Sequence, residues 1–145
     1  MRHVYHCPLR WADMDSLGHV NNVTYVDYLQ ESRVDMLAVH APASGGEDLA
    51  EGVVVVRHEV EFVAPLVFRP EPVRIESWIT QVRAASFTMA YEILDELPDG
   101  ERRVYCRALS VLTPFVFTEE RPRRITPEER EVLEGLLEPG FEAAR

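Results

Sequence analysis

The 145-residue sequence lacks the features that mark several specialised classes of protein. It contains no lysine, and its 15 arginines are outnumbered by 25 acidic residues, so the formal net charge is −10. This charge argues against nucleic acid or an anionic membrane surface as the main partner. Two cysteines cannot build a disulfide framework, the first residues contain no apolar signal region, and no run of apolar residues approaches the length of a membrane span. We therefore expect a cytoplasmic protein.

What is present favours one globular domain with a substantial core. Hydrophobic residues make up 46% of the chain, which excludes disorder, and this length suffices for a single core. The sequence contains no internal repeat and no low-complexity tract. We therefore expect a single domain over residues 1–145.

Hydrophobic periodicity predicts one long helix and a series of strands. Residues 22–39 carry apolar side chains on more than one side, which predicts a helix that is largely covered by protein. Proline and paired glycines make the segment 40–52 loop-like. The segments expected to form strands are 2–10, 53–62, 73–80, 86–94 and 102–117.

The connections between these segments predict how they are arranged. Short links, such as the hairpin turn Pro98-Asp99-Gly100, favour an antiparallel sheet, since parallel strands need long crossovers. Near the end of the chain, Thr126-Pro127-Glu128-Glu129 has the spacing of a capping box, which predicts a short helix to about residue 138. One long helix against one antiparallel sheet is an α+β arrangement.

The turn before the long helix, residues 12–21, combines the groups that acyl-transfer chemistry needs. Asp15 supplies a carboxylate, Gly18 permits a tight bend, and Asn21 or Asn22 can cap the helix. The free N–H groups at the helix start would face whatever binds beside Asp15. A fixed carboxylate next to such donors can attack or deprotonate while an oxyanion is stabilised.

A more specific motif surrounds this helix start. It reads Asp13-x-Asp15-x-x-Gly18-His19-Val20-Asn21-Asn22-x-x-Tyr25. Together with the order of elements, this motif resembles the hotdog-fold acyl thioesterases, above all the 4-hydroxybenzoyl-CoA thioesterase group and the small bacterial acyl-CoA thioesterases. The resemblance implies a hotdog fold, in which an antiparallel five-stranded sheet wraps around a long central helix, and it implies hydrolysis of an acyl thioester.

The resemblance also implies roles for individual residues. In the 4-hydroxybenzoyl-CoA group the second aspartate of the Asp-x-Asp pair is catalytic, which matches Asp15. The backbone N–H that polarises the thioester carbonyl falls at Asn22. His19 either contacts the thioester or braces the turn, and Gly18 and Tyr25 are expected beside the substrate.

A second part of the site is implied by a turn between two strands. In some relatives the turn between the second and third long strands contributes basic contacts to coenzyme A. The matching turn here is residues 82–86, in which Arg83 is the single basic residue. We therefore expect Arg83 and Ser86 to contact the substrate.

Several residues in the motif also have simpler interpretations. Asp15 would be an ordinary turn residue without the flanking motif, and Asp13 is expected to be structural. The two aspartates imitate the start of an EF-hand loop, but Leu17 and Thr24 occupy ligand positions, so no calcium site is expected. No cysteine or second histidine lies nearby, so no transition-metal site is expected either. On the helix, Glu31 and Arg33 are expected to form a structural ion pair rather than a second catalytic pair.

We therefore expect hydrolysis of an acyl-CoA or acyl carrier protein thioester, with Asp15 as nucleophile or general base and no metal or organic cofactor. The alternatives are a non-catalytic acyl-CoA-binding hotdog module and a hotdog dehydratase that acts on acyl thioesters. One helix on a five-stranded sheet leaves edge strands exposed, which association can cover. Both this hazard and the resemblance point to a homodimer or a homotetramer.

Overall fold

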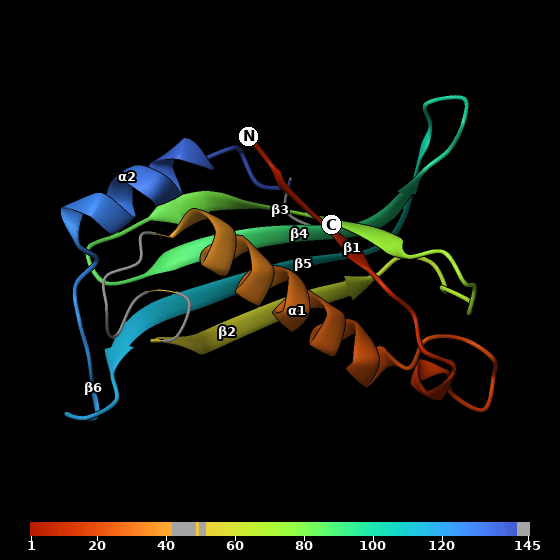
Figure 1. Ribbon diagram of the computed structural model, residues 1–145, viewed down its shortest axis with the longest axis horizontal. Coiled ribbons are helices and arrows are strands. Elements are labelled where there is room, and N and C mark those ends of the chain that lie inside the picture. Colours follow the sequence, from red (N-terminus) through yellow and green to blue (C-terminus); the bar gives the residue numbers. More distant parts are fainter. Residues whose placement is uncertain (42–48, 50–51, 142–145) are drawn as a thin grey trace.

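The computed structural model describes residues 1–41, 49 and 52–141 of the chain. Figure 1 shows a long helix lying across a curved sheet, with a shorter helix at one end of the sheet. The helices are α1, Asn22–His40, and α2, Pro127–Gly135, and a 3-10 turn, η1, spans Trp11–Asp13. The strands are β1, His3–Cys7; β2, Val53–Phe62; β3, Val73–Val82; β4, Phe87–Glu96; β5, Arg102–Val116; and β6, Arg121–Pro122.

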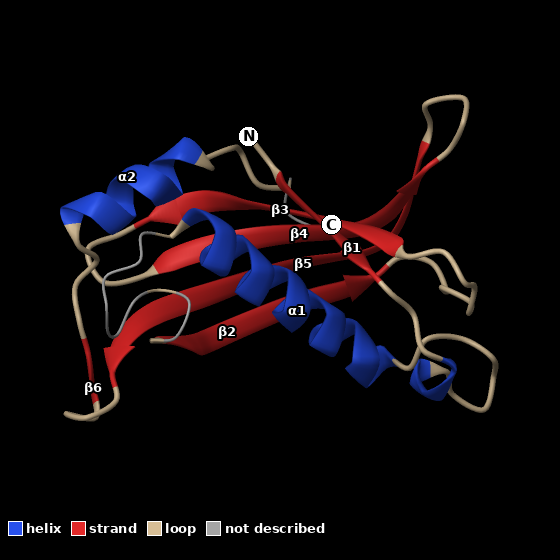
Figure 2. Cartoon of the chain, viewed as in Figure 1, coloured by secondary structure: helices blue, strands red, loops and turns tan. Residues whose placement is uncertain are grey.

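The strands form one antiparallel sheet in the order β1-β3-β4-β5-β2, and the short β6 pairs with the end of β5. The tight connections from β3 to β4 and from β4 to β5 dictate antiparallel neighbours. Figure 2 shows the two layers, with α1 in front of the sheet. The expected α+β arrangement is confirmed, and β1 and β2 are the two edges of its five long strands.

The core lies between α1 and the side of the sheet that faces it. Alternate residues of each central strand point to this side, and burying each large apolar side chain contributes roughly 1.5–3 kcal/mol. From β4 these residues are Phe87, Met89, Tyr91 and Ile93, all at most 1% exposed. From α1 the buried apolar residues are Tyr25, Tyr28, Leu29, Met36 and Leu37.

Some local features differ from the sequence expectations. The first strand ends at Cys7, because Pro8 has no N–H to donate to a ladder. The 3-10 turn η1 occupies the beginning of the expected turn, and β6 was not expected. The loop expected over residues 40–52 lies largely outside the described residues.

Helix α1 is covered on one side only, which corrects the expectation that protein covers most of it. The sheet buries one face of the helix, whereas Val23, Val34 and Val39 on other faces are 67%, 49% and 64% exposed. The apolar residues on these faces gave the sequence its pattern of hydrophobicity on several sides. A single protomer therefore leaves apolar helix surface in contact with water.

The face of the sheet that points away from α1 carries a network of charges. Glu76 on β3 has a side chain that is 5% exposed, and it accepts hydrogen bonds from three arginines, Arg2, Arg74 and Arg102. Burial alone would raise the pKa of Glu76, but these hydrogen bonds outweigh it and lower the pKa to about 2. A second carboxylate, Glu92 on β4, shares two of the arginines.

Because of this network, the stability of the fold should fall when the pH becomes acidic. Because the pKa of Glu76 lies below its usual 4.5 in the folded state, its carboxylate stabilises the fold above pH 4.5, and this contribution is lost as the pH falls toward 2. We expect Glu76→Gln to lower the free energy of unfolding at neutral pH by about 2 kcal/mol and to flatten its acid dependence. Urea unfolding across this range measures both effects. Glu119→Gln, an exposed carboxylate paired with Arg121, is the control. An unchanged acid slope in Glu76→Gln would contradict the assignment.

Candidate active site

The turn that precedes α1 is closed by its own backbone. Asp15 donates its amide to the carbonyl of His19 at 2.8 Å, and Asn21 donates to the carbonyl of Asp13 at 2.9 Å. Between them Gly18 adopts a φ of +78°, a left-handed conformation that favours glycine. The predicted turn therefore forms a narrow hairpin-like loop with Gly18 near its tip.

The turn is also fastened to the segment that follows β2. Val20 donates its amide to the carbonyl of Leu66 at 2.8 Å, and His19 pairs with Val67 in an antiparallel bridge. Tyr25 Oη accepts a hydrogen bond from the Leu66 amide at 3.1 Å. Tyr25 is 4% exposed and supports the turn from within the core, and its expected place beside the substrate stays a prediction. No local sequence pattern predicts this long-range contact.

Asp13 anchors the turn to the helix, as expected for a structural residue. Its side chain is 2% exposed and accepts hydrogen bonds from Tyr28 Oη at 2.6 Å and from the Arg10 guanidinium at 2.9 Å. Burial alone would raise the pKa of Asp13, but the hydrogen bonds from Tyr28 and Arg10 lower it on balance. Sequence reasoning named Tyr28 only as a side chain that could close the acyl pocket and did not predict its hydrogen bond to Asp13, although it lies one helical turn beyond Tyr25 on the buried face.

Asp15 has one oxygen engaged in the turn and one oxygen free. Its Oδ1 accepts hydrogen bonds from the amides of Leu17 at 2.9 Å and His19 at 3.3 Å. Its Oδ2 accepts none from any residue in the described part of the chain. The side chain is half-buried. The ordinary turn role and a chemical role are therefore compatible, because the turn orients the carboxylate without using its second oxygen.

The start of α1 leaves one backbone N–H without a partner. Asn21 is the N-cap, and its side-chain oxygen accepts the amide of Val23 at 2.9 Å. The Asn21 carbonyl accepts the amides of Thr24 and Tyr25. Among residues 1–41, 49 and 52–141, no acceptor is bonded to the Asn22 amide. This is the amide that the resemblance implies for the oxyanion, and it lies at the positive end of the helix dipole.

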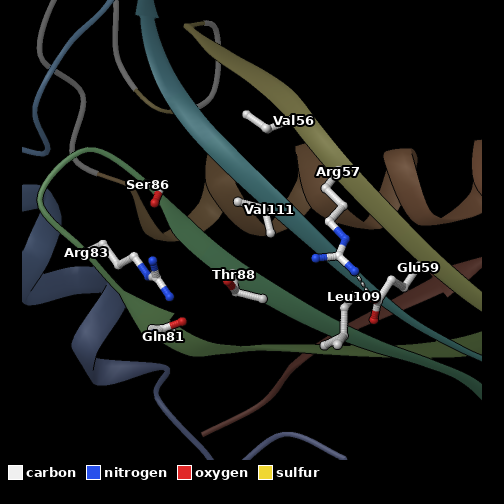
Figure 3. A pocket seen from close by; sticks show the side chains of 9 residues that line it. All are labelled: Val56, Arg57, Glu59, Gln81, Arg83, Ser86, Thr88, Leu109 and Val111. Carbon is white, nitrogen blue, oxygen red and sulfur yellow. Dashed lines mark hydrogen bonds and ion pairs between the residues drawn. The ribbon is translucent and has the colours of Figure 1, made fainter. Parts of the chain in front are cut away.

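Arg83 and Ser86 lie at the opposite end of the molecule from Asp15. They belong to the β3–β4 turn, beside the end of the sheet where α1 ends, and α1 itself is about 28 Å long at ~1.5 Å per residue. Figure 3 shows that both residues line a groove on the sheet face away from α1, which reaches the edge strand β2 at Val56 and Arg57. The groove has a volume of about 430 Å³. Asp15, Gly18, His19 and Asn22 therefore lie in one turn and the helix start that follows it, whereas Arg83 and Ser86 lie far from them within one chain.

Other reactive groups in the described residues offer little chemistry. Burial raises the pKa of the Cys7 and Cys106 thiols to about 12, so neither is a nucleophile near neutral pH. No group of three or more histidine, cysteine, aspartate or glutamate side chains in this part of the chain is placed to hold a metal ion. Among the described residues, the half-buried Asp15 and the Asn22 amide at the start of α1 are the groups suited to chemistry on a carbonyl.

Comparison with known proteins identifies the family. The family model for the thioesterase-like superfamily matches residues 9–136. The chain belongs to this superfamily. A comparison with curated proteins finds no match by sequence.

Solved structures agree with this family. A candidate acyl-CoA thioesterase from Xanthomonas campestris is 33% identical over 77% of this chain and 91% of its own, with a TM-score of 0.63. A protein from Bacillus stearothermophilus described as a predicted thioesterase is 21% identical over 97% of this chain and all of its own, with a TM-score of 0.81. A 4-hydroxybenzoyl-CoA thioesterase, an aspartate-to-asparagine variant complexed with 4-hydroxybenzoyl-CoA, is 16% identical over 91% of this chain and 98% of its own, with a TM-score of 0.79.

These findings confirm the hotdog fold and the expected family, and they show that the protein is a thioester hydrolase. Helix α1 runs across the sheet as the central helix of that fold. Neither helix in the described residues has the length and apolar character needed to cross a membrane.

The tight turn of the thioesterase should be sensitive to loss of Gly18. A Cβ at this position meets no atom within 4 Å, so Gly18→Ala adds backbone strain without a steric clash. We expect a loss of stability of about 1 kcal/mol and a fall in turnover of at least about tenfold, because the strain displaces Asp15. Gly100→Ala in the β4–β5 hairpin is matched to it, with a φ of +89° and equally open space. It should cost similar stability in thermal melts but keep its activity. Equal activity in the two variants would contradict a catalytic role for the turn.

Proposed function

We propose that the thioesterase hydrolyses an acyl-CoA thioester with Asp15 as its catalytic carboxylate. The observation that carries the proposal is that one turn and its helix start supply both a carboxylate oxygen, Asp15 Oδ2, and an amide, Asn22 N–H, that have no hydrogen-bond partner among the described residues. The complex of an aspartate-to-asparagine thioesterase variant with its acyl-CoA supports an aspartate in this role. The family and fold support the thioester.

The chemistry follows from the positions of these two groups. The Asn22 amide donates to the thioester oxygen and stabilises the negative charge that develops on it, aided by the helix dipole. Asp15 Oδ2 either attacks the carbonyl carbon or removes a proton from a water molecule that attacks it. The carbon–sulfur bond then breaks, and coenzyme A leaves as a thiolate that needs no strong general acid. In the first route water afterwards hydrolyses the mixed anhydride and frees Asp15.

We propose that His19 acts through the turn rather than on the substrate. Its backbone N–H donates to Asp15 Oδ1, its carbonyl accepts the Asp15 amide, and it also pairs with Val67, so these contacts hold the turn that carries the Asp15 carboxylate. Gly18 contributes by making the bend possible.

A second copy of the chain is proposed to complete the site. The edge strand β2 exposes Val56 and Phe62, which are 64% and 50% exposed, and an unpaired edge of this kind invites pairing with another strand. The apolar surface continues around the Asp15 turn through Leu17 and Val23, which are 77% and 67% exposed. Two copies that pair antiparallel through β2 would cover this surface.

The same pairing of two chains would bring Arg83 of one chain close to Asp15 of the other. An antiparallel arrangement about β2 puts the Phe62 end of one strand beside the Val53 end of the other. The groove that holds Arg83 and Ser86 reaches this end of β2 at Val56. Arg83 of the partner subunit would then meet the phosphates of a coenzyme A whose thioester lies at Asp15.

The central test of this function is Asp15→Asn. The amide keeps the hydrogen bonds of the turn but is neither a base nor a nucleophile, so kcat should fall by about 10²–10⁴ while substrate binding survives. Thiol release from an acyl-CoA panel measures activity, and thermal melts check folding. Asp99→Asn is the matched control, since Asp99 also accepts the amide two residues ahead, from Glu101, in an exposed turn. Full activity in Asp15→Asn would overturn the mechanism.

The shared site makes a separate prediction about Arg83. Arg83→Ala should raise KM for a CoA thioester about tenfold with little change in kcat, because a phosphate contact binds ground and transition states alike. A pantetheine thioester, which lacks the nucleotide phosphates, should show no such change.

Mixed dimers test whether the site is shared between subunits. When Asp15→Asn and Arg83→Ala chains are co-expressed, each mixed dimer contains one site with both native residues if Asp15 and Arg83 come from different subunits. A component with the wild-type KM should therefore appear. Activity with only the raised KM would show that Arg83 serves its own chain.

A further inference from the structure

The groove on the sheet face away from α1 contains a second arginine that the proposed function does not use. Arg57 on β2 lines the groove together with Arg83, and Figure 3 shows the two side chains on opposite sides of it. Arg57 pairs with Glu59 through one nitrogen, and its guanidinium has no other partner among the described residues. The Arg83 guanidinium has no hydrogen bond or ion pair within this part of the chain. Both arginines can therefore bond to an anion that enters the groove.

The register of the strands fixes how far apart the two arginines lie. Arg57 on β2 pairs with Val111 on β5. Val111 in turn pairs with Thr88 on β4, and Thr88 pairs with Gln81 on β3. These residues form one row across the sheet, and Arg83 follows two positions after Gln81. Neighbouring strands are about 4.8 Å apart, so the three steps from β2 to β3 separate the two arginine-bearing backbones by about 14 Å.

The space between the arginines has the character of a nucleotide site. Its floor consists of Leu109, Val111 and Thr88, and its volume of about 430 Å³ is ordinary for a small-molecule site. An apolar floor with a cation on each side suits a ligand that has a flat body and two separate phosphate groups. The nucleotide end of coenzyme A has this form, since its adenosine carries a diphosphate on the 5′ oxygen and a single phosphate on the 3′ oxygen.

We propose that the groove binds coenzyme A through two separate phosphate contacts, with Arg57 on the diphosphate and Arg83 on the ribose 3′-phosphate. The inference rests on the proposed function, because a thioester at Asp15 of the partner subunit sets the direction from which coenzyme A enters. Coenzyme A crosses the β2 edge on its way to the groove, so it meets Arg57 before Arg83. The diphosphate adjoins the pantetheine arm and the 3′-phosphate lies beyond it. The order of the two arginines therefore matches the order of the phosphates.

Pairing of two chains through β2 leaves this groove open. Strands pair through backbone groups in the plane of the sheet, whereas side chains stand out of that plane. The Arg57 side chain points to the face away from α1 and is 67% exposed. Its guanidinium therefore remains on an open face in the proposed dimer.

The binding of free coenzyme A and of 3′-dephospho-coenzyme A tests this assignment without any turnover. In calorimetric titrations the wild type should bind coenzyme A at least about tenfold more tightly than the dephospho form, because the latter lacks one charge-assisted contact. Arg83→Ala should bind the two ligands equally. Arg57→Ala should weaken the binding of both by about tenfold and keep the preference for coenzyme A.

Arg121→Ala is the matched control for these variants. Arg121 is likewise an exposed arginine paired with a glutamate two positions away, Glu119, and it does not line the groove. It should bind both ligands as the wild type does.

Asp15→Asn separates failure of this inference from failure of the proposed function. It should show the wild-type binding pattern, and that pattern would support the two phosphate contacts even if Asp15→Asn proved fully active. Equal binding of the two ligands by the wild type would overturn the inference. Wild-type affinities in Arg57→Ala, or a preference for coenzyme A that survives in Arg83→Ala, would also overturn it.

Discussion

The hydrogen bond from Tyr28 to Asp13 is the contact on which the geometry of the site depends. Tyr28 belongs to α1 and Asp13 to the turn before it, so the bond ties the turn to the helix that it precedes. The carbonyl of the same aspartate accepts the Asn21 amide, which places the N-cap at the entrance of the helix. The two groups proposed for chemistry, the Asp15 carboxylate and the Asn22 amide, thus lie on either side of a closed loop.

The fold separates the two parts of the proposed site. The groups proposed for the thioester lie where α1 begins, and the groove that contains Arg83 lies where α1 ends. The two parts lie near opposite ends of α1, so they stay about one helix length apart within one chain. The exposed β2 edge offers a resolution, since antiparallel pairing of two copies reverses the direction of one of them. The proposed dimer would also cover the apolar surface that a single chain leaves exposed.

Local charge decides more in this protein than net charge does. The chain is strongly acidic, yet its proposed ligand carries phosphates. Arginines create local positive charge at particular places in this acidic protein. Three surround Glu76, Arg83 lines the groove at the β3–β4 turn, and Arg33 is buried on the side of α1 that faces the sheet. The three arginines around Glu76 stabilise the fold, because each of them pairs with its carboxylate.

Local patterns in the sequence were enough to predict the class of fold, and they also led to the residues proposed for the thioester. The alternation of the strands, the short links between them and the motif around Gly18 are local properties, and each depends on residues that are neighbours in the chain. The cap at Asn21 and the structural role of Asp13 follow from the same local rules.

Only the tertiary structure decided which residues of the motif face solvent and which support it. Tyr25 is buried because the Leu66 segment folds back onto the turn, and Arg33 lacks the expected partner because helix geometry turns Glu31 away. The distance from Asp15 to Arg83 could likewise not be predicted from the sequence, since it depends on the direction in which α1 crosses the sheet. Contacts between residues far apart in the chain carry no local pattern, so they appear only when the layers are assembled.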